Sequence, residues 1–285
     1  MSAPTKTRQS DAIAELIERS RLEILPLDGT AEKVVAHVPR DVTLTVTASP
    51  TKGLDATFAL AEQLIDEGYT VVPHLSARLV ESKARLGERL AQAESLGMRD
   101  VFVIAGDAEQ PAGPYEGSLP LLRDMAELGH PFLHVGIAGY PETHPLFDDA
   151  TAIAAMTEKQ EYATYIATQV CFDSHLTASW IEQVWGRGTR LPVYVGIPGA
   201  VSRAKLLRVS ARIGIGQSLR FLRKNGSFAS RFLSGGFDPD QLIDGLGGLL
   251  TDPDGKLAGF HVFTFNDIED TEIWRLNLLR EGGRA

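Results

Sequence analysis

The sequence predicts an α/β fold in which eight parallel strands close into a single barrel. Short, β-branched apolar runs recur along the whole chain, and most of them are followed by a longer amphipathic segment. Connections of this length join parallel strands in a right-handed sense, and eight such units suffice to close a (β/α)8 TIM barrel. The expected strands are residues 21–27, 42–48, 70–75, 101–106, 132–138, 165–170, 192–197 and 259–265.

The segments between the strands support helices. Residues 53–68, 80–97 and 118–129 carry apolar side chains at helical spacing and close with a glycine, which suits a left-handed C-cap. The first crossover is short, so its helix is expected to be stunted. Residues 11–19 predict an extra amphipathic N-terminal helix that caps the barrel bottom, after a flexible tail at 1–10. An open doubly wound sheet is the alternative, but "LPLDGTAEK" lacks its glycine fingerprint.

Composition narrows the class of protein. The 285 residues contain 44% apolar and 23% charged residues, which is typical of a globular protein, and neither repeats nor linkers divide the chain. We therefore expect one domain, 1–285. A net charge of −9 argues against non-specific binding to nucleic acid or anionic membranes. The first 20 residues lack a secretory signal, so a cytoplasmic location is expected. The single cysteine, Cys171, excludes a cysteine-based metal cage.

Polar side chains recur where the expected strands end. In barrels of this type the chemistry lies at the carboxyl ends of the strands. Taken singly, Glu23 could be an edge residue, Asp107 a turn residue and His74 a core histidine. Their recurrence at equivalent positions favours one shared site, formed by Glu23, Thr47, His74, Asp107, Tyr140, His144, Gln169 and Asn266.

Several of these stretches match a known family. "VPHLSAR", "VFVIAGD", "GIAGYPETHP" and "IATQVCFD" resemble strand-end motifs of the methylenetetrahydrofolate reductases, and they occur in the family's order. "RLEILP" and "GFHVFTFN" resemble the family's first and last strands. The resemblance implies an oxidoreductase that interconverts 5,10-methylenetetrahydrofolate and 5-methyltetrahydrofolate through FAD, with NAD(P)H as the other hydride partner. Such relatives tend to self-associate, so a homo-oligomer is expected.

The resemblance also assigns roles to residues. Glu23 would be the general acid that helps to open the five-membered folate ring, and Asp107 would lie beside the flavin and bind the pterin amino groups. The flavin would be lined by Thr47, His74, Gly106, Asp107, Ala138, Tyr140, His144 and Lys159. The folate would contact Gln169, Gln217 and Phe221.

The sequence departs from the family at positions that bear on the cofactor. Ala105 replaces an arginine, and Asp267 stands where many members have an arginine near the folate. Of the family's cofactor-binding cations only Lys159 is retained, and it aligns only if one residue is deleted. Weakly held FAD, a flavin-independent reductase using NAD(P)H directly, and a non-redox folate-binding barrel therefore remain alternatives. The sequence does not choose between NADH and NADPH, or between the two directions of the reaction.

Two further stretches have structural and functional interpretations. In "ARIGIGQSLRFLRKNG", Gly214 and Gly216 could simply separate two helices, and a solvated basic face is favoured over tail binding for Arg220, Arg223 and Lys224. For Asp173 and His175, a helix N-cap and a surface histidine are favoured over metal ligands. No metal site is expected.

Overall fold

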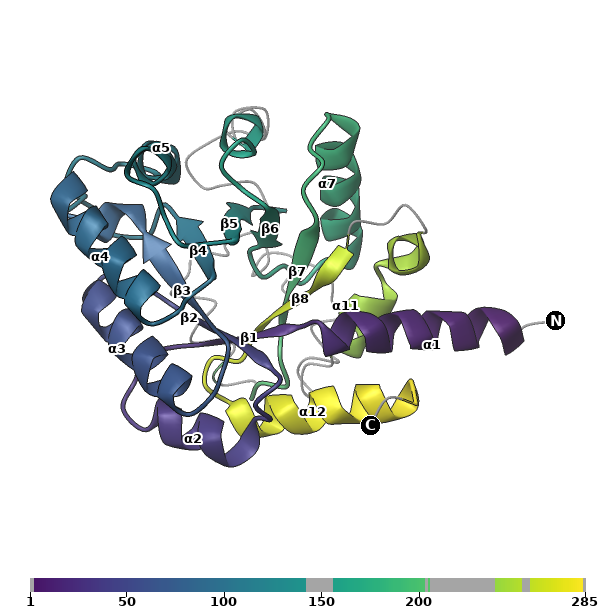
Figure 1. The fold of residues 1–285 in the computed structure, drawn as a ribbon. Coiled ribbons are helices and arrows are strands. Elements are labelled where there is room, and N and C mark those ends of the chain that lie inside the picture. Colours follow the sequence, from purple (N-terminus) through teal and green to yellow (C-terminus); the bar gives the residue numbers. More distant parts are fainter. Residues whose placement is uncertain (1–2, 142–155, 203–204, 206–238, 253–256, 284–285) are drawn as a thin grey trace.

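The computed structural model describes residues 3–141, 156–202, 205, 239–252 and 257–283. Its eight described strands form a closed barrel in the order β1 to β8, and every neighbouring pair is parallel (Figure 1). The predicted TIM barrel is therefore confirmed. The strands are β1 Arg21–Ile24, β2 Thr43–Val46, β3 Val71–Ser76, β4 Asp100–Ile104, β5 His134–Gly139, β6 Tyr165–Thr168, β7 Val193–Pro198 and β8 Leu257–Phe263.

Helices surround the barrel (Figure 1). The described α-helices are α1 Ala3–Glu18, α2 Thr30–His37, α3 Gly53–Asp66, α4 Lys83–Ser95, α5 Ser118–Leu128, α7 Ser174–Gly186, α11 Asp240–Asp244 and α12 Ile268–Glu281. Two 3₁₀ turns are η1 Ala77–Leu79 and η2 Gly247–Thr251. The short first crossover contains only the eight-residue α2, as expected.

The N-terminal helix is longer than the sequence suggested. It begins at Ala3 rather than at residue 11, so residues 3–10 of the expected tail are helical. Pro4 lies in the first turn, where a proline costs no intrahelical hydrogen bond. The helix packs on α12, β8 and η2. Gly259 permits this contact, because an added Cβ would lie 2.9 Å from the carbonyl oxygen of Arg19.

The core has two parts. Between the strands and the helices lies a large apolar cluster that includes Leu22, Leu44 and Val262. Alternate strand residues point the other way, into the barrel, where Phe102 and Tyr165 form a small second cluster with their neighbours. Successive strand side chains alternate between faces, so each strand contributes to both parts. The inner part is poor in aliphatic residues, which leaves room for polar groups inside the barrel.

A polar network fills the amino-terminal end of the barrel interior. The guanidinium of Arg21 lies between the rings of Tyr165 and Tyr194, at 4.4 and 4.1 Å from their centroids, and pairs with Asp100 at 2.9 Å. The Tyr165 hydroxyl donates to Asp100 at 2.9 Å. Burial raises the pKa of Asp100, and Arg21 and Tyr165 oppose that rise. Because an arginine does not lose its proton in a protein, the network keeps one fixed positive charge below Glu23.

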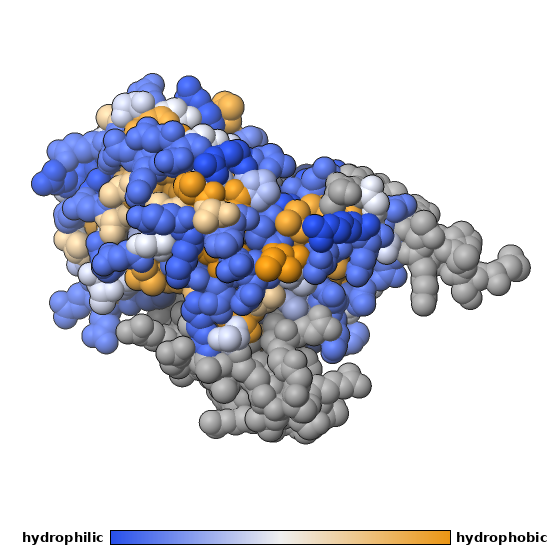
Figure 2. All heavy atoms as spheres, turned by 90° about the horizontal axis from the view of Figure 1, so that it is seen from below, coloured by the Kyte–Doolittle hydropathy of each residue, from blue (hydrophilic) through white to orange (hydrophobic). Residues whose placement is uncertain are grey.

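The surface is mostly hydrophilic. On the face shown in Figure 2, apolar side chains form small separate groups among polar ones. The most exposed large apolar residue in the described part is Leu133, at 69%, and isolated residues of this kind are normal on soluble domains. Within the described ranges, no helix is both long and apolar enough to cross a membrane.

Candidate active site

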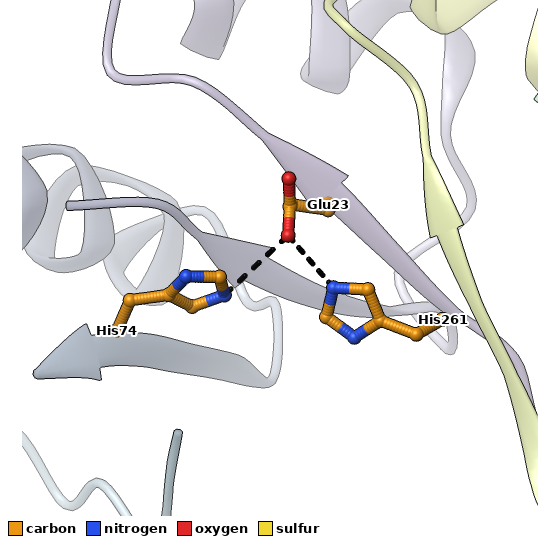
Figure 3. Close-up of side chains that lie close together, drawn as sticks. All are labelled: Glu23, His74 and His261. Atoms are coloured by element: carbon orange, nitrogen blue, oxygen red, sulfur yellow. Dashed lines mark hydrogen bonds and ion pairs between the residues drawn. The ribbon is translucent and has the colours of Figure 1, made fainter. Parts of the chain in front are cut away.

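Glu23 points into the barrel, where it meets two histidines. Its Oε2 lies 2.8 Å from Nε2 of His261 on β8 and 3.8 Å from Nε2 of His74 on β3 (Figure 3). Since β2 separates β1 from β3 in the sheet, the approach of Glu23 to His74 crosses the interior. The three side chains therefore form one cluster inside the barrel, which we call the Glu23 cluster.

Aromatic rings surround this cluster. Phe102 packs edge-on against His74 with centroids 4.8 Å apart, and it lies 5.7 Å from His261. The side chains of His74 and His261 are 4% and 2% exposed, and that of Glu23 is 13% exposed. Burial lowers the pKa of His74 well below its usual value, and the charge of His261 lowers it further. His74 is thus a neutral imidazole at physiological pH.

The end of β8 fixes the backbone around Glu23. The Thr264 hydroxyl donates to the carbonyl of Glu23 at 2.6 Å. The Asn266 side chain accepts from the Leu25 amide at 2.8 Å and donates to the Leu25 carbonyl at 3.1 Å. To do so, Asn266 adopts a left-handed conformation, with φ 63°, which asparagine tolerates better than most residues. Asn266 does lie at the barrel mouth, but its side chain holds the neighbouring strand.

Asp107 and Tyr140 form a second group, after β4 and β5. Burial raises the pKa of Tyr140 to about 12, and the negative charge of Asp107 contributes to the rise. Asp107 itself is exposed. The preceding Gly106 has φ 89°, and an added Cβ would lie 1.8 Å from the Ser76 hydroxyl. Only glycine fits at that position, so it sets the path of the loop that carries Asp107.

Arg78 holds the same loop in place. Its guanidinium donates to the carbonyls of Ala108 at 2.6 Å, Glu109 at 2.6 Å and Glu116 at 3.1 Å. Its backbone amide also donates to the carbonyl of Ala105 at 3.0 Å. These contacts tie the β4–α5 loop to the end of β3. The sequence analysis did not identify Arg78, although it lies two residues after the end of β3 in "VPHLSAR".

The other expected cofactor residues differ in their surroundings. The Thr47 hydroxyl is buried and has no hydrogen-bond partner within the described part of the chain. Ala138 packs against the inner cluster. Burial lowers the pKa of Lys159, whereas the neighbouring Glu158 is exposed and pairs with Arg123 at 3.6 Å. Lys159 is therefore partly withdrawn from solvent, whereas Glu158 is not.

The expected folate contacts are only partly described. The Gln169 side-chain oxygen accepts from the Val170 amide at 2.9 Å, so only its amino group is free of that contact. The following candidates lie outside the described residues: His144, Gln217, Phe221, Arg220, Arg223 and Lys224.

The structure also describes the surroundings of Asp173, His175 and Asp267, which the sequence analysis had singled out. Asp173 is the N-cap of α7 and accepts from the Leu176 amide at 3.0 Å, while His175 is exposed, as expected. Asp267 pairs with Lys205 and accepts from the Ser202 amide at 3.2 Å. The carboxylate that replaces a family arginine thus has its own cation and anchors the segment after β7.

The contacts join only some of the predicted residues. Glu23 lies near His74, and the charge of Asp107 raises the pKa of Tyr140. Thr47 follows β2, Ala138 lies on β5 and Gln169 follows β6. His261 is the main omission. Its strand was predicted, and a closed barrel makes β8 a neighbour of β1, so alternation along "GFHVFTF" could have placed His261 beside Glu23.

The closed parallel barrel holds a carboxyl group and two imidazoles in its interior, just below the carboxyl ends of the strands. Barrel enzymes have their catalytic centres at this end of the barrel, so the cluster is a candidate catalytic centre. Residues 26–216 match the family model described as methylenetetrahydrofolate reductase. That match spans more than half of the chain, and the chain belongs to this family.

Individual relatives are distant. The chain is 26% identical over 218 residues to "Methylenetetrahydrofolate reductase 2" of Saccharomyces cerevisiae. This alignment covers 68% of this chain and 34% of the relative. It is 28% identical over 116 residues to "Methylenetetrahydrofolate reductase 1" of Schizosaccharomyces pombe, covering 38% and 19%. The aligned region thus spans about a third or less of these relatives' length. A solved structure titled as a putative lyase/mutase from Burkholderia cenocepacia J2315 aligns with TM-score 0.46 and 16% identity, over 84% of this chain and 97% of that one.

Proposed function

We propose that this chain catalyses hydride transfer between NAD(P)H and a folate one-carbon unit, interconverting 5,10-methylenetetrahydrofolate and 5-methyltetrahydrofolate. The observation that carries the proposal is the contact between the partly buried Glu23 and the buried His261 inside the barrel of a chain from this family. A carboxyl group with a hydrogen-bonded imidazole can hold a proton, release it and receive it back.

Glu23 acts as the general acid. When the five-membered ring of 5,10-methylenetetrahydrofolate opens, the bond between the methylene carbon and N10 breaks, and the carboxyl of Glu23 gives its proton to N10. His261 lies 2.8 Å away, so it holds the carboxyl group and can return a proton to it after turnover. The hydride then reaches the methylene carbon. General acid catalysis of this kind contributes about 100- to 10,000-fold to a rate.

Asp107, Tyr140 and their neighbours bind the rings. Asp107 accepts hydrogen bonds from the pterin amino groups, and Tyr140 offers a flat face beside it. Gln169 donates to the folate ring through its amino group. Gln217 and Phe221 remain proposed folate contacts, and His144 a proposed flavin contact.

The described residues fit a flavin at the mouth. The buried Thr47 hydroxyl lacks a partner in the described structure, and a flavin edge would supply one. Gly106, Ala138 and His74 would lie beside the flavin ring, and the partly buried Lys159 would meet the pyrophosphate. FAD, when bound, carries the hydride between nicotinamide and folate.

A flavin-independent reaction is the second candidate. Ala105 offers no guanidinium where the family has an arginine, and Arg78, the described arginine at the end of β3, is already used by three carbonyls. A direct transfer from NAD(P)H to the folate keeps the same role for Glu23. A folate-binding barrel without redox turnover is the third. A cytoplasmic location and a homo-oligomer are also part of the proposal.

One assay separates the three candidates. Purified protein is supplied with NADH or NADPH and methylenetetrahydrofolate, with and without added FAD, and nicotinamide oxidation and methyltetrahydrofolate are measured. Turnover that requires FAD supports the first candidate, and turnover by protein shown to lack flavin supports the second. Folate binding without turnover under any condition would leave the non-redox barrel.

A further inference from the structure

The Glu23 cluster contains the donor atoms of a metal site. Glu23 on β1, His74 on β3 and His261 on β8 each direct one ligand atom to a common point, and the three atoms lie within 4.8 Å of one another (Figure 3). Two imidazole nitrogens and one carboxylate oxygen are a donor set that suits Zn²⁺ and other divalent first-row metals. The three strands belong to one closed barrel, so the ligands sit on rigid elements.

His74 gives an independent indication that something else binds there. Its Nε2 is buried and has no hydrogen-bond partner among the described residues, although it faces the Glu23 carboxylate. The side chain is 4% exposed, so bulk water does not compensate. A buried polar atom without a partner is uncommon and is costly unless a ligand satisfies it. At 3.8 Å the carboxylate oxygen of Glu23 is too far from His74 Nε2 for a hydrogen bond, whereas His261 Nε2 reaches the same oxygen at 2.8 Å.

We propose that Glu23, His74 and His261 bind one divalent transition-metal ion. With metal–ligand bonds of about 2.0–2.1 Å, the ligand atoms of a tetrahedral site lie about 3.4 Å apart. The separations of Glu23 from His261 and from His74, 2.8 and 3.8 Å, lie on either side of that value. The widest separation in the set is at most 4.8 Å, so it must shorten by up to about 1.4 Å when an ion binds.

Three protein ligands leave a coordination position open. Zinc sites with three protein ligands keep the fourth position for water or substrate, and Glu23 is the most exposed of the three side chains here, at 13%. Metal binding requires an ionised carboxylate and therefore displaces any proton held by Glu23. The ion is thus an inhibitor of the reaction proposed above. This consequence rests on the proposed function, but the binding site does not.

Metal binding can be measured without any folate or nicotinamide. Tag-free protein, stripped with a chelator that is then removed, is titrated with Co²⁺ while visible absorption is recorded, and with Zn²⁺ in a calorimeter. We expect one saturable equivalent, and a Co²⁺ spectrum with the intensity of a four- or five-coordinate ion. His74→Gln, His261→Gln and Glu23→Gln should each weaken binding at least about tenfold.

The control is His175→Gln, which removes an exposed histidine on α7 and should bind like the parent protein. Circular dichroism checks that each variant is folded. The Co²⁺ spectrum of the unmodified protein tests the site even if a variant fails to fold. Lack of saturable binding at one equivalent, a spectrum of six-coordinate Co²⁺, or folded cluster variants that bind as tightly as the parent would overturn the proposal.

A separate assay distinguishes this proposal from the proposed function. If Zn²⁺ binds through the cluster but the protein does not turn over folate, the metal site stands and the reductase assignment fails. If folate reduction occurs and Zn²⁺ neither binds nor inhibits, the metal site fails alone. When both hold, one equivalent of Zn²⁺ should abolish most of the activity, and a chelator should restore it.

Discussion

Glu23 and His261 are 238 residues apart in the sequence, yet their side chains meet at 2.8 Å. The contact exists because β8 returns to pair with β1, with Glu23 in register with Phe263 and Arg21 in register with His261. Closure of the barrel therefore brings Glu23, on the first strand, into contact with His261, on the last.

His261→Gln should slow folate reduction without affecting the reduction of the flavin by NAD(P)H. Glutamine can hold the Glu23 carboxyl group by a hydrogen bond, but it cannot return a proton. We expect a loss of about tenfold to a hundredfold in the folate half-reaction and a changed pH profile, measured by stopped-flow absorbance. His130→Gln, on the α5–β5 connection, is the matched control. Equal losses in both half-reactions would point to a structural role.

Arg78→Ala should loosen the loop that carries Asp107. Three carbonyls lose their charged donor, so we expect a higher KM for folate with a smaller change in kcat. Hydrogen exchange at the amides of residues 106–117 should become faster. Arg85→Ala, which removes an exposed arginine paired with Glu88 on α4, should change neither quantity. Unchanged exchange in Arg78→Ala would show that the loop is held by other contacts.

Asp100→Asn should destabilise the fold strongly. The change leaves the buried Arg21 guanidinium without its counter-ion, and breaking a buried pair in this way costs about 3 kcal/mol or more. Glu88→Gln breaks an exposed pair on α4 and should cost less than about 1 kcal/mol. Both are measured by denaturant unfolding at neutral pH. A cost below about 1 kcal/mol for Asp100→Asn would mean that the buried Arg21 charge does not need an ionised partner.

Tyr140 should make stability fall at alkaline pH. Its pKa is raised to about 12 in the folded protein, mainly by burial, whereas an unfolded tyrosine ionises near 10. Above pH 10 the unfolded chain loses the proton and the folded chain keeps it, so unfolding is favoured as the pH rises from 10 to 12. Between pH 9 and 11 the parent should lose about 1 kcal/mol more than Tyr140→Phe. Identical losses in denaturant unfolding would contradict the assignment.

The fold could be predicted from the sequence because its signals are local. Most strands are short β-branched runs, and several of the helices between them have a clear periodicity and a glycine end, so the order of elements implies the barrel. The start of α1 was misplaced because "APTKTRQS" has no apolar stripe that would distinguish a helix from a tail.

The site was harder to predict from the sequence than the fold, because its contacts join residues that are far apart in the chain. Glu23 and His74 could be proposed from strand ends and family motifs, but their meeting through the interior depends on barrel geometry. His261 and Thr264 contact Glu23 across the β1–β8 pairing, which becomes visible only once the barrel is taken as closed. The Arg78 contacts depend on the path of a loop without regular structure, which neither periodicity nor a motif specifies.

The reduction of methylenetetrahydrofolate by the parent protein and by Glu23→Gln, compared under the same conditions, tests the central claim most directly. With FAD and NAD(P)H present, we expect methyltetrahydrofolate from the parent and a rate about 100- to 10,000-fold lower from Glu23→Gln, with nicotinamide-dependent flavin reduction nearly unchanged. Equal rates of folate reduction in the two proteins, or no methyltetrahydrofolate from the folded parent with or without flavin, would contradict the account.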